Sequence, residues 1–231
     1  EIGKFYGWIY EGIARTQDEL DGHATQQGAN VGDCLYKDIS GPNGEPDGVI
    51  DAYDQTVLGS GLPKVNFGLS THMEYKGFDL NISTYGVLNY HVSDDIYNSL
   101  NSCYGYGNKE VGMLDANRWS EDGSTYLSSV PRTYAANNAT LGWNDLFSSR
   151  KIQNAAYWKI ANVELGYNFP DKWFGGYVSG VRLYVSAQNL YTFTGYHGYN
   201  VDYAGGTFTP GYNFCSFPSA RTFMCGLHFT F

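Results

Sequence analysis

Basic residues are scarce in this chain of 231 residues, which has 14 lysines and arginines against 23 aspartates and glutamates. The formal net charge of -9 argues against a nucleic-acid partner, because binding a phosphate backbone requires concentrated Lys and Arg side chains. The chain also lacks any apolar run of about 18 residues, so no membrane-spanning helix is predicted. No signal peptide is predicted within these residues either. The opening EIGKFYGWIYEG already has the composition of a strand, and we expect a mature or truncated piece of a longer protein.

Cysteine and histidine are few and scattered. The four cysteines, at positions 34, 103, 215 and 225, form no CxxC pair, and no histidine stands at zinc-ligand spacing, which argues against a metal-thiolate site. The first three lie in Gly-, Asn- and Ser-rich segments where any two could form a disulfide, whereas Cys225 suits a small apolar position on a strand. None of the five histidines lies beside a Ser or Cys nucleophile in the sequence. We therefore predict that the protein is not an enzyme.

Glycine and aromatic residues are abundant instead, with 29 Gly, 21 Tyr, 13 Phe and 5 Trp. This composition suits strands and turns better than helices. The clearest strands are residues 64–75 and 78–90, in which apolar and polar residues alternate and which only Lys76 and Gly77 separate. A two-residue hairpin places Tyr75 opposite Phe78 on one face, so the two patterns agree in register. The sequence therefore predicts a hairpin here.

Alternation of the same kind, least regular in the first case, marks four more segments, which are residues 2–13, 157–169, 181–193 and 222–231. In 157–169 it groups Tyr157, Ala161 and Val163 on the apolar face and Trp158 and Ile160 on the polar face. In the last segment the apolar face collects Phe223, Cys225, Leu227, Phe229 and Phe231. Six long strands are therefore predicted.

The connections between these strands alternate between long and short. Their lengths are about fifty, two, about sixty, about eleven and about twenty-six residues, in chain order. If the strands run up and down, every long loop leaves at one end and every short turn at the other, with the C-terminus on the short-turn side. This asymmetry is typical of transmembrane β-barrels, which have short periplasmic turns and long extracellular loops.

A soluble β-sandwich also has alternating strands, so two further features favour the barrel. The polar face carries side chains at mid-strand that suit a water-filled lumen, namely His72, Glu74, Asp79, Asn81 and Glu164. Aromatic residues collect beside the short turns, as an interfacial girdle requires, among them Tyr75, Phe78, Tyr167, Phe169 and Phe229. The predicted fold is an all-β, antiparallel transmembrane β-barrel segment.

Five stretches, in this order, resemble the C-terminal part of SusC/RagA-family TonB-dependent outer-membrane transporters of Bacteroidetes: YKDISGPNGEPDGVIDAYD, LPKVNFGLSTHMEYKGFDLNIS, YWKIANVELGYNFP, VRLYVSAQNLYTFTGYHGYNVD and FPSARTFMCGLHFTF. The chain departs from the family pattern at Lys159, where an Arg is common, and around Asp202, where a G-x-D-P motif is only loosely present. The resemblance implies that residues 1–231 supply about six C-terminal strands of a 22-stranded barrel, without its plug domain and N-terminal strands.

The resemblance also implies a function and partners. It implies TonB-dependent uptake of oligosaccharides or peptides together with a SusD-like lipoprotein, with TonB acting through the absent N-terminal part. The location implied is the outer membrane of a Gram-negative bacterium, with the long loops extracellular and the C-terminus periplasmic. Because an open sheet leaves unpaired edges in lipid, the chain must pair with the remainder of its own barrel. The alternatives are a secreted or surface glycan-binding β-domain and, less favoured by the resemblance, a passive porin.

The acidic segment from Asp38 to Asp54 follows the order of an EF-hand-like calcium loop if residues 40–44 are treated as an insertion. Calcium takes six to eight oxygen ligands and needs a glycine at the sharp turn, here Gly48. The candidate ligands are Asp38, Glu45, Asp47, Asp51 and Asp54. A solvated acidic loop is the alternative interpretation. A bound ion would be structural, and no other cofactor is predicted.

The predicted loops are rich in aromatic residues, namely Tyr104, Tyr106, Trp119, Tyr126, Tyr134, Trp143, Tyr196, Tyr199, Tyr203 and Tyr212. Aromatic rings stack on the apolar CH patches of sugars, while neighbouring amides and carboxylates bind the hydroxyl groups. Trp119, Trp143 and Tyr196 are therefore the candidate substrate-binding residues. The alternative is that these rings pack the loops against one another and against the lipoprotein.

Overall fold

The computed structural model describes residues 2–103, 108–113, 118–120, 128–133, 142–173, 178–202 and 205–230. The chain divides into two compact units, each built from three segments. The first unit contains Glu1–Leu62, His91–Gln153 and Ala204–Cys215, and the second contains Pro63–Tyr90, Asn154–Tyr203 and Ser216–Phe231. In the described parts of the chain, no helix combines the length and apolar character needed to cross a membrane.

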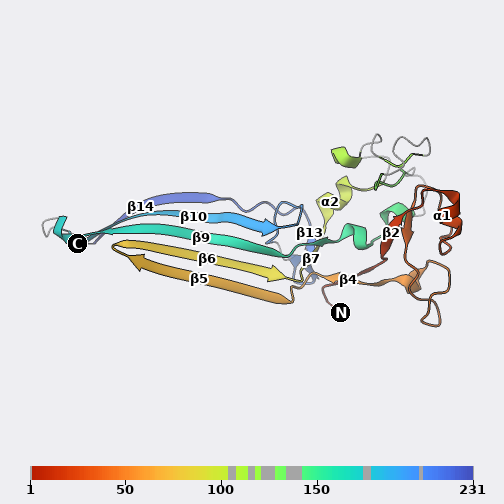
Figure 1. Ribbon diagram of the computed structural model, residues 1–231, viewed down its shortest axis with the longest axis horizontal. Coiled ribbons are helices and arrows are strands. Elements are labelled where there is room, and N and C mark those ends of the chain that lie inside the picture. The colour runs from red at the N-terminus through yellow and green to blue at the C-terminus, as the bar shows by residue number, and fades with distance from the viewer. Residues whose placement is uncertain are drawn as a thin grey trace. The chain divides into compact units, whose positions relative to one another are not determined.

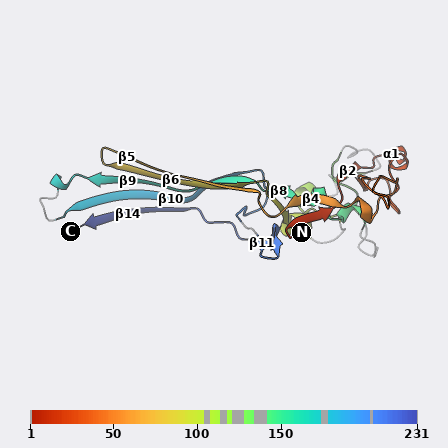
Figure 2. The ribbon, with the colours of Figure 1, turned by 90° about the horizontal axis from the view of Figure 1, so that it is seen from below.

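The second unit is one antiparallel sheet of five long strands in the order β14-β10-β9-β6-β5 (Figure 1). The strands are β5 (Val65–Tyr75), β6 (Phe78–Leu88), β9 (Tyr157–Phe169), β10 (Gly180–Thr194) and β14 (Thr222–Thr230), and the 3-10 turn η6 (Asp171–Trp173) follows β9. Five of the six predicted strands are thus confirmed. Seen from below, the sheet is a single layer (Figure 2).

The predicted hairpin is present. Tyr75 pairs with Phe78, and the two residues between them, Lys76 and Gly77, have φ angles of 48° and 88°. Positive φ at both positions is the geometry of the two-residue turn that matches the twist of the strands. A side chain at Gly77 would also meet the carbonyl oxygen of Asn168 at 2.9 Å, so glycine satisfies two requirements there.

The strand registers confirm the prediction that the short connections lie at one end of the sheet and the long connections at the other. Phe78 at the start of β6 pairs with Tyr167 at the end of β9, and Tyr167 pairs with Leu183 near the start of β10. Thr230 at the end of β14 pairs with Gly180. The β5–β6 turn, the β9–β10 connection and the end of β14 therefore lie at one end of the sheet. The long connections leave at the other end.

The predicted first strand, residues 2–13, is wrong as a member of this sheet. The segment forms two short strands of the first unit, β1 (Lys4–Gly7) and β2 (Tyr10–Ile13), which pair with β4 (Thr56–Ser60) and β3 (Cys34–Tyr36). Both pairs contain a register shift. Phe5 and Ile13 are buried while Tyr6 is 54% exposed, so the segment packs on a core and presents no continuous apolar face.

Strict alternation is also wrong near the start of β9. Ser83 pairs with Asn162 but Thr84 pairs with Ile160, which leaves Ala161 as the extra residue of a β-bulge. Because one extra residue moves every later side chain to the other face, Trp158 and Ile160 lie on the apolar face. Tyr157 and Lys159 lie on the polar face. Strand β10 has a matching irregularity, because two residues without a partner on β9 lie between Gln188, which pairs with Asn162, and Tyr191, which pairs with Ile160.

The first unit is built from short elements. Besides β1 to β4 they are α1 (Gln17–Asp21), η1 (Ala52–Asp54), β7 (His91–Asp94), α2 (Asp95–Leu100), η2 (Val111–Met113), η4 (Trp143–Asp145), η5 (Ser149–Lys151), β8 (Gln153–Asn154, at the boundary of the units), β11 (Gly205–Gly206), β12 (Thr209–Pro210) and β13 (Tyr212–Asn213). Cys34, Tyr36 and Ile50 form a buried core, and Trp143 and Leu146 pack against it.

A buried polar network ties the long connections of this unit together. The Asn144 side chain accepts a hydrogen bond from the backbone N–H of Cys34 (2.7 Å) and donates one to Asp33 (2.8 Å). Arg132 donates two hydrogen bonds to the same Asp33 carboxylate, at 2.6 and 2.9 Å, and this bonding raises the pKa of Arg132. Burial raises the pKa of Cys34 to about 12. All four cysteines lie in the described residues and are free thiols.

Candidate functional site

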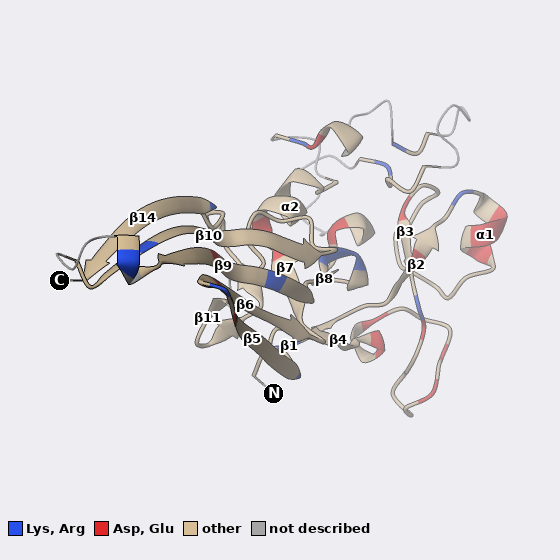
Figure 3. Cartoon of the chain, turned by 60° about the vertical axis from the view of Figure 1, so that its left-hand side comes forward, with Lys and Arg blue, Asp and Glu red and all other residues tan. Residues whose placement is uncertain are grey.

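One face of the five-stranded sheet is apolar and exposed along its length. Leu69 is 63% exposed, Leu227 58% and Val185 50%. Figure 3 shows that few positions on the long strands are charged, whereas acidic residues gather on α1 in the first unit. A continuous exposed apolar face of this kind marks contact with lipid or with another protein.

Aromatic rings border this apolar face at both ends. At the short-turn end, the ring centroids of Phe78 and Tyr167 lie 4.6 Å apart. At the end with the long connections, Trp158 stacks on Phe193 at 5.2 Å and Phe193 meets Tyr191 at 4.7 Å. About eight residue steps at ~3.3 Å separate the two belts, or ~26 Å along the strands, close to the height of the apolar band of an outer-membrane barrel.

The sequence interpretation predicted the first belt and missed the second. The reason is the bulge at Ala161, which turns Trp158 from the polar face assigned to it toward the apolar face. A local signal existed, because Trp158 and Ile160 are bulky apolar residues that alternate with Lys159 at the very start of the strand. An alternation assumed to run without interruption from residue 157 to 169 places Trp158 and Ile160 on the polar face, so this local signal is lost.

The opposite face carries a network of charged side chains. The Arg182 guanidinium donates to both carboxylate oxygens of Asp79, with Nε to Oδ2 at 3.0 Å, and donates to Glu164 at 2.7 Å. The Asn168 amide donates to Asp79 at 3.0 Å. Asp79 and Glu164 were predicted on this face and are confirmed there. Charged groups on one face and apolar groups on the other are the pattern of a barrel wall with a polar interior.

A second group on the polar face is centred on His72. Its ring nitrogens lie 2.6 Å from Asn81 Oδ1 and 2.9 Å from Glu74 Oε1. These three residues were predicted on the polar face, and the strand register confirms that they share it.

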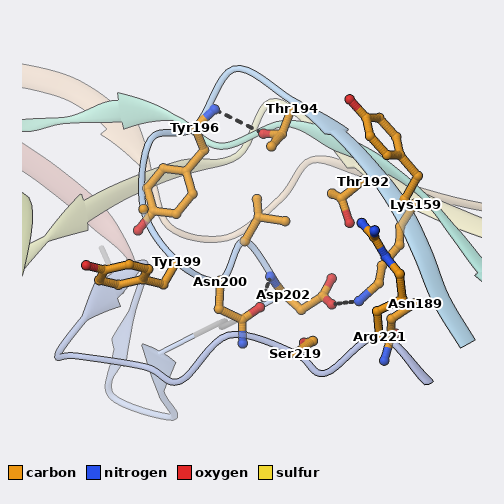
Figure 4. Close-up of a pocket in the computed structure, with 13 residues that line it drawn as sticks. Lys159, Asn189, Thr192, Thr194, Tyr196, Tyr199, Asn200, Asp202, Ser219 and Arg221 are labelled. Atoms are coloured by element: carbon orange, nitrogen blue, oxygen red, sulfur yellow. Dashed lines mark hydrogen bonds and ion pairs between the residues drawn. The ribbon is translucent and has the colours of Figure 1, made fainter.

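The polar face also contributes to a cavity of 310 Å³ within the second unit (Figure 4). Lys159 forms an ion pair with Asp202 there, and its side chain is only 4% exposed. Tyr196 and Tyr199 lie on one side of the cavity and Arg221 on the other. The two positions at which the sequence departs from the family pattern, Lys159 and Asp202, thus contact each other.

Asparagine side chains fix one wall of this cavity. Asn189 donates to the backbone carbonyl of Ala220 at 2.9 Å, and Asn200 donates to that of Phe217 at 3.0 Å. The segment between β10 and β14 is therefore held at two points. Asn189 has a φ of 52°, a left-handed conformation that asparagine tolerates better than most residues.

The three predicted substrate-binding residues fall in different units. Trp119 and Trp143 belong to the first unit, where Trp119 is 8% exposed and the Trp143 indole donates to the carbonyl of Gln27 at 3.1 Å. Tyr196 belongs to the second unit and lines the cavity. Of the other aromatic candidates, Tyr199 also lines the cavity and Tyr212 lies on β13. The rest lie outside the described residues, as does Phe231, namely Tyr104, Tyr106, Tyr126, Tyr134 and Tyr203.

The predicted calcium loop folds as a series of turns closed by carboxylates. Backbone N–H groups donate to Asp38 (from Gly48, 2.7 Å), Asp47 (from Val49, 3.1 Å), Asp51 (from Tyr53, 2.7 Å) and Asp54 (from Ile39, 2.8 Å). Asp54 is fully buried, and Glu45 is exposed. Within the described ranges, no three metal-ligating side chains come together. Calcium binding stays a prediction.

Comparisons with known proteins agree with this geometry. No family model matches the chain. TonB-dependent receptor P3 of Formosa agariphila is 31% identical over 100% of this chain, and TonB-dependent receptor SusC of Bacteroides thetaiotaomicron is 26% identical over 85% of it. The chain spans only 22% and 19% of the length of these relatives.

Two solved structures share the fold. The RagAB peptide transporter matches with a TM-score of 0.73 and 21% identity over 99% of this chain and 22% of its own. The RagAB peptide importer in the closed-closed state matches with a TM-score of 0.70 over 98% of this chain and 23% of its own. The five-stranded sheet is therefore an antiparallel segment of this type of barrel.

Proposed function

Because this chain belongs to the SusC/RagA-type TonB-dependent receptors, of which it spans about a fifth of the length, we propose that it forms part of the wall of an outer-membrane nutrient importer. The observation that carries the proposal is the exposed apolar face bordered by two aromatic belts, with the Arg182 network on the opposite face. Lipid contacts the apolar face, and the polar face lines the lumen.

The two edges of the sheet support a larger barrel. Strand β5 is exposed along its whole length, and β14 is exposed except at Gly226. Unpaired backbone N–H and C=O groups at such edges are too costly to leave in lipid, so each edge pairs with a further strand. In this proposal residues 1–231 are the C-terminal portion of the receptor. The remaining strands and the plug domain come from the rest of the polypeptide.

The orientation and partners follow from the same proposal. The short turns and the end of β14 face the periplasm, and the long connections face the outside. A SusD-like lipoprotein covers the outer end, TonB supplies energy through the plug, and the cargo is an oligosaccharide or a peptide. The names of the similar proteins support two parts of this proposal, since the relative SusC is a TonB-dependent receptor and RagAB is a peptide transporter, while the lipoprotein and the oligosaccharide come from the family resemblance.

A charge scan across one strand tests the proposal. In the full-length receptor, Val185→Arg puts a charge in the middle of the apolar face, which costs about 2–4 kcal/mol at the bilayer midplane. Gln188→Arg is the matched control, because Gln188 is also exposed but lies on the polar face. We expect Val185→Arg to reduce heat-modifiable, folded receptor in outer membranes and Gln188→Arg to leave it unchanged.

The opposite result would contradict the proposal. If Val185→Arg assembles normally while Gln188→Arg does not, the apolar face does not contact lipid. A receptor that folds as a monomer in buffer without detergent would favour the alternative, a surface glycan-binding β-domain.

A further inference from the structure

The side chains that line the cavity of the second unit carry more positive than negative charge. Two cations line it, Lys159 and Arg221, together with one carboxylate, Asp202. Lys159 and Asp202 neutralise each other in a pair that is largely shielded from solvent. Arg221 is exposed, and no ion pair involves it among the described residues. One positive charge is therefore in surplus, in a chain whose net charge is -9.

The backbone that carries the surplus charge is held in place. Arg221 directly follows Ala220, whose carbonyl accepts the hydrogen bond from Asn189, and directly precedes β14. Its backbone is thus anchored on both sides, and Figure 4 shows its side chain beside Lys159 and Asn189 in the cavity. The guanidinium of Arg221 is planar and presents a pair of donors that matches the two oxygens of a carboxylate.

The cavity also offers contacts for the rest of a solute. Tyr199 is 68% exposed and lies across the cavity from Arg221. Its ring gives an apolar surface for a sugar or a side chain, while the threonine hydroxyls of β10, Thr192 and Thr194, lie along the lining. The volume of 310 Å³ is at the lower end of small-molecule sites, enough for one sugar ring or one residue of a longer cargo.

We infer that this cavity is a subsite that binds a carboxylate of the transported solute, with Arg221 as the carboxylate ligand and Tyr199 as the stacking surface. The inference rests on the proposed import function and narrows the cargo to one that carries an acid. Lys159 is a positioning residue, because its charge is already bound to Asp202. Uronate groups of an oligosaccharide and the C-terminus of a peptide share this chemistry.

Binding to the purified full-length receptor tests the inference. The probes are two matched pairs: an oligouronate and a neutral oligosaccharide of equal length, and a peptide with a free C-terminus and its C-terminal amide. The variants are Arg221→Gln, Arg221→Lys and the control Lys172→Gln, which removes an exposed cation in the β9–β10 connection. Isothermal titration calorimetry gives Kd for each combination.

We expect Arg221→Gln to weaken binding of the acidic member of one pair about tenfold or more and to leave its neutral partner unaffected, the effect of losing one charge-assisted hydrogen-bonded contact. Arg221→Lys should retain part of the affinity, and Lys172→Gln all of it. The pair that responds identifies the source of the carboxylate.

Two results would overturn the inference. Equal effects of Arg221→Gln on acidic and neutral probes, or no effect on either, would mean that Arg221 binds no carboxylate while import itself stands. A wild-type receptor that neither binds nor transports any of the four probes would contradict the proposed function as well.

Discussion

At the scale of single residues, Gly166 shows why the charged network of the polar face is possible. A side chain at this position would meet Asp79 Oδ2 at 2.4 Å and Arg182 Nη2 at 2.5 Å. The missing side chain thus opens the space in which Arg182 reaches across from β10 to Asp79 on β6. Gly226 plays the same part beneath the ring of Tyr184, which a side chain there would meet at 2.6 Å.

Removing the cation of this network should destabilise the barrel. Arg182→Met leaves Asp79, which is 4% exposed, without its counter-charge, and we expect the free energy of unfolding to fall by about 2 kcal/mol. The double variant Arg182→Met, Asp79→Asn should recover most of the loss, because the buried unpaired charge of Asp79 is gone and the Glu164 carboxylate, which also loses Arg182, is 26% exposed. The measurement is the temperature at which the full-length receptor loses heat-modifiable mobility. A double variant weaker than the single one would refute this account.

The cysteines should differ in reactivity. Burial raises the pKa of Cys34 to about 12 from an ordinary value of 9.0, and burial also raises the pKa of Cys103. Because the neutral thiol is favoured in the folded state, its contribution to stability is present below pH 9 and is lost as the pH rises toward 12. At pH 8 we expect iodoacetamide to label the exposed Cys215 and to spare Cys34 and Cys103. Peptide mass spectrometry checks this, with urea-unfolded protein as control.

At the scale of elements, the bulge in β9 decides which side chains meet lipid. Deleting Ile160 and Ala161 together would remove the bulge and one paired residue, and would turn Lys159 toward the apolar face and Trp158 toward the lumen. Deleting Ala161 alone is the matched control, because Ile160 then stands next to Asn162 and every side chain keeps its face. We expect the double deletion to abolish assembly of the receptor in the outer membrane and the single deletion to allow it. Normal assembly of the double-deletion variant would show that the facing of these side chains has no such role.

The acidic segment from Asp38 to Asp54 gives a prediction about metal removal. If calcium binds there, residues 38–54 of the full-length receptor should be cleaved faster by a protease in EGTA than in millimolar calcium. Magnesium is the matched control, because it prefers smaller octahedral sites with fewer protein ligands. Cleavage at equal rates in calcium and EGTA would favour the solvated acidic loop.

At the scale of the whole molecule, import should depend on energy. We expect uptake by the full-length receptor to disappear when TonB is deleted and to return when TonB is supplied again. Growth on the cargo as the limiting nutrient, or uptake of labelled cargo, measures this. Uptake that persists without TonB would support the passive porin instead.

The molecule also shows which features a sequence reveals. The long strands, the hairpin at Lys76 and Gly77, and the sorting of connections were predictable, because alternation and turn chemistry are local. The bulge at Ala161 was not, since it is defined by the pairing of β9 with its neighbours. The contact of Lys159 with Asp202, 43 positions apart, depends on how a long connection returns to the sheet.

The two-residue turn between β5 and β6 limits how such receptors diversify. Positive φ at Lys76 and Gly77 matches the turn to the twist of both strands, so a change there costs stability, whereas the connections at the opposite end are long and irregular. In the proposed importer, sequence changes in the long connections can therefore alter which cargo binds while the strands of the barrel stay the same. Exchanging residues 195–221, which contain Tyr199 and Arg221, between relatives should transfer ligand preference and leave the barrel wall unchanged.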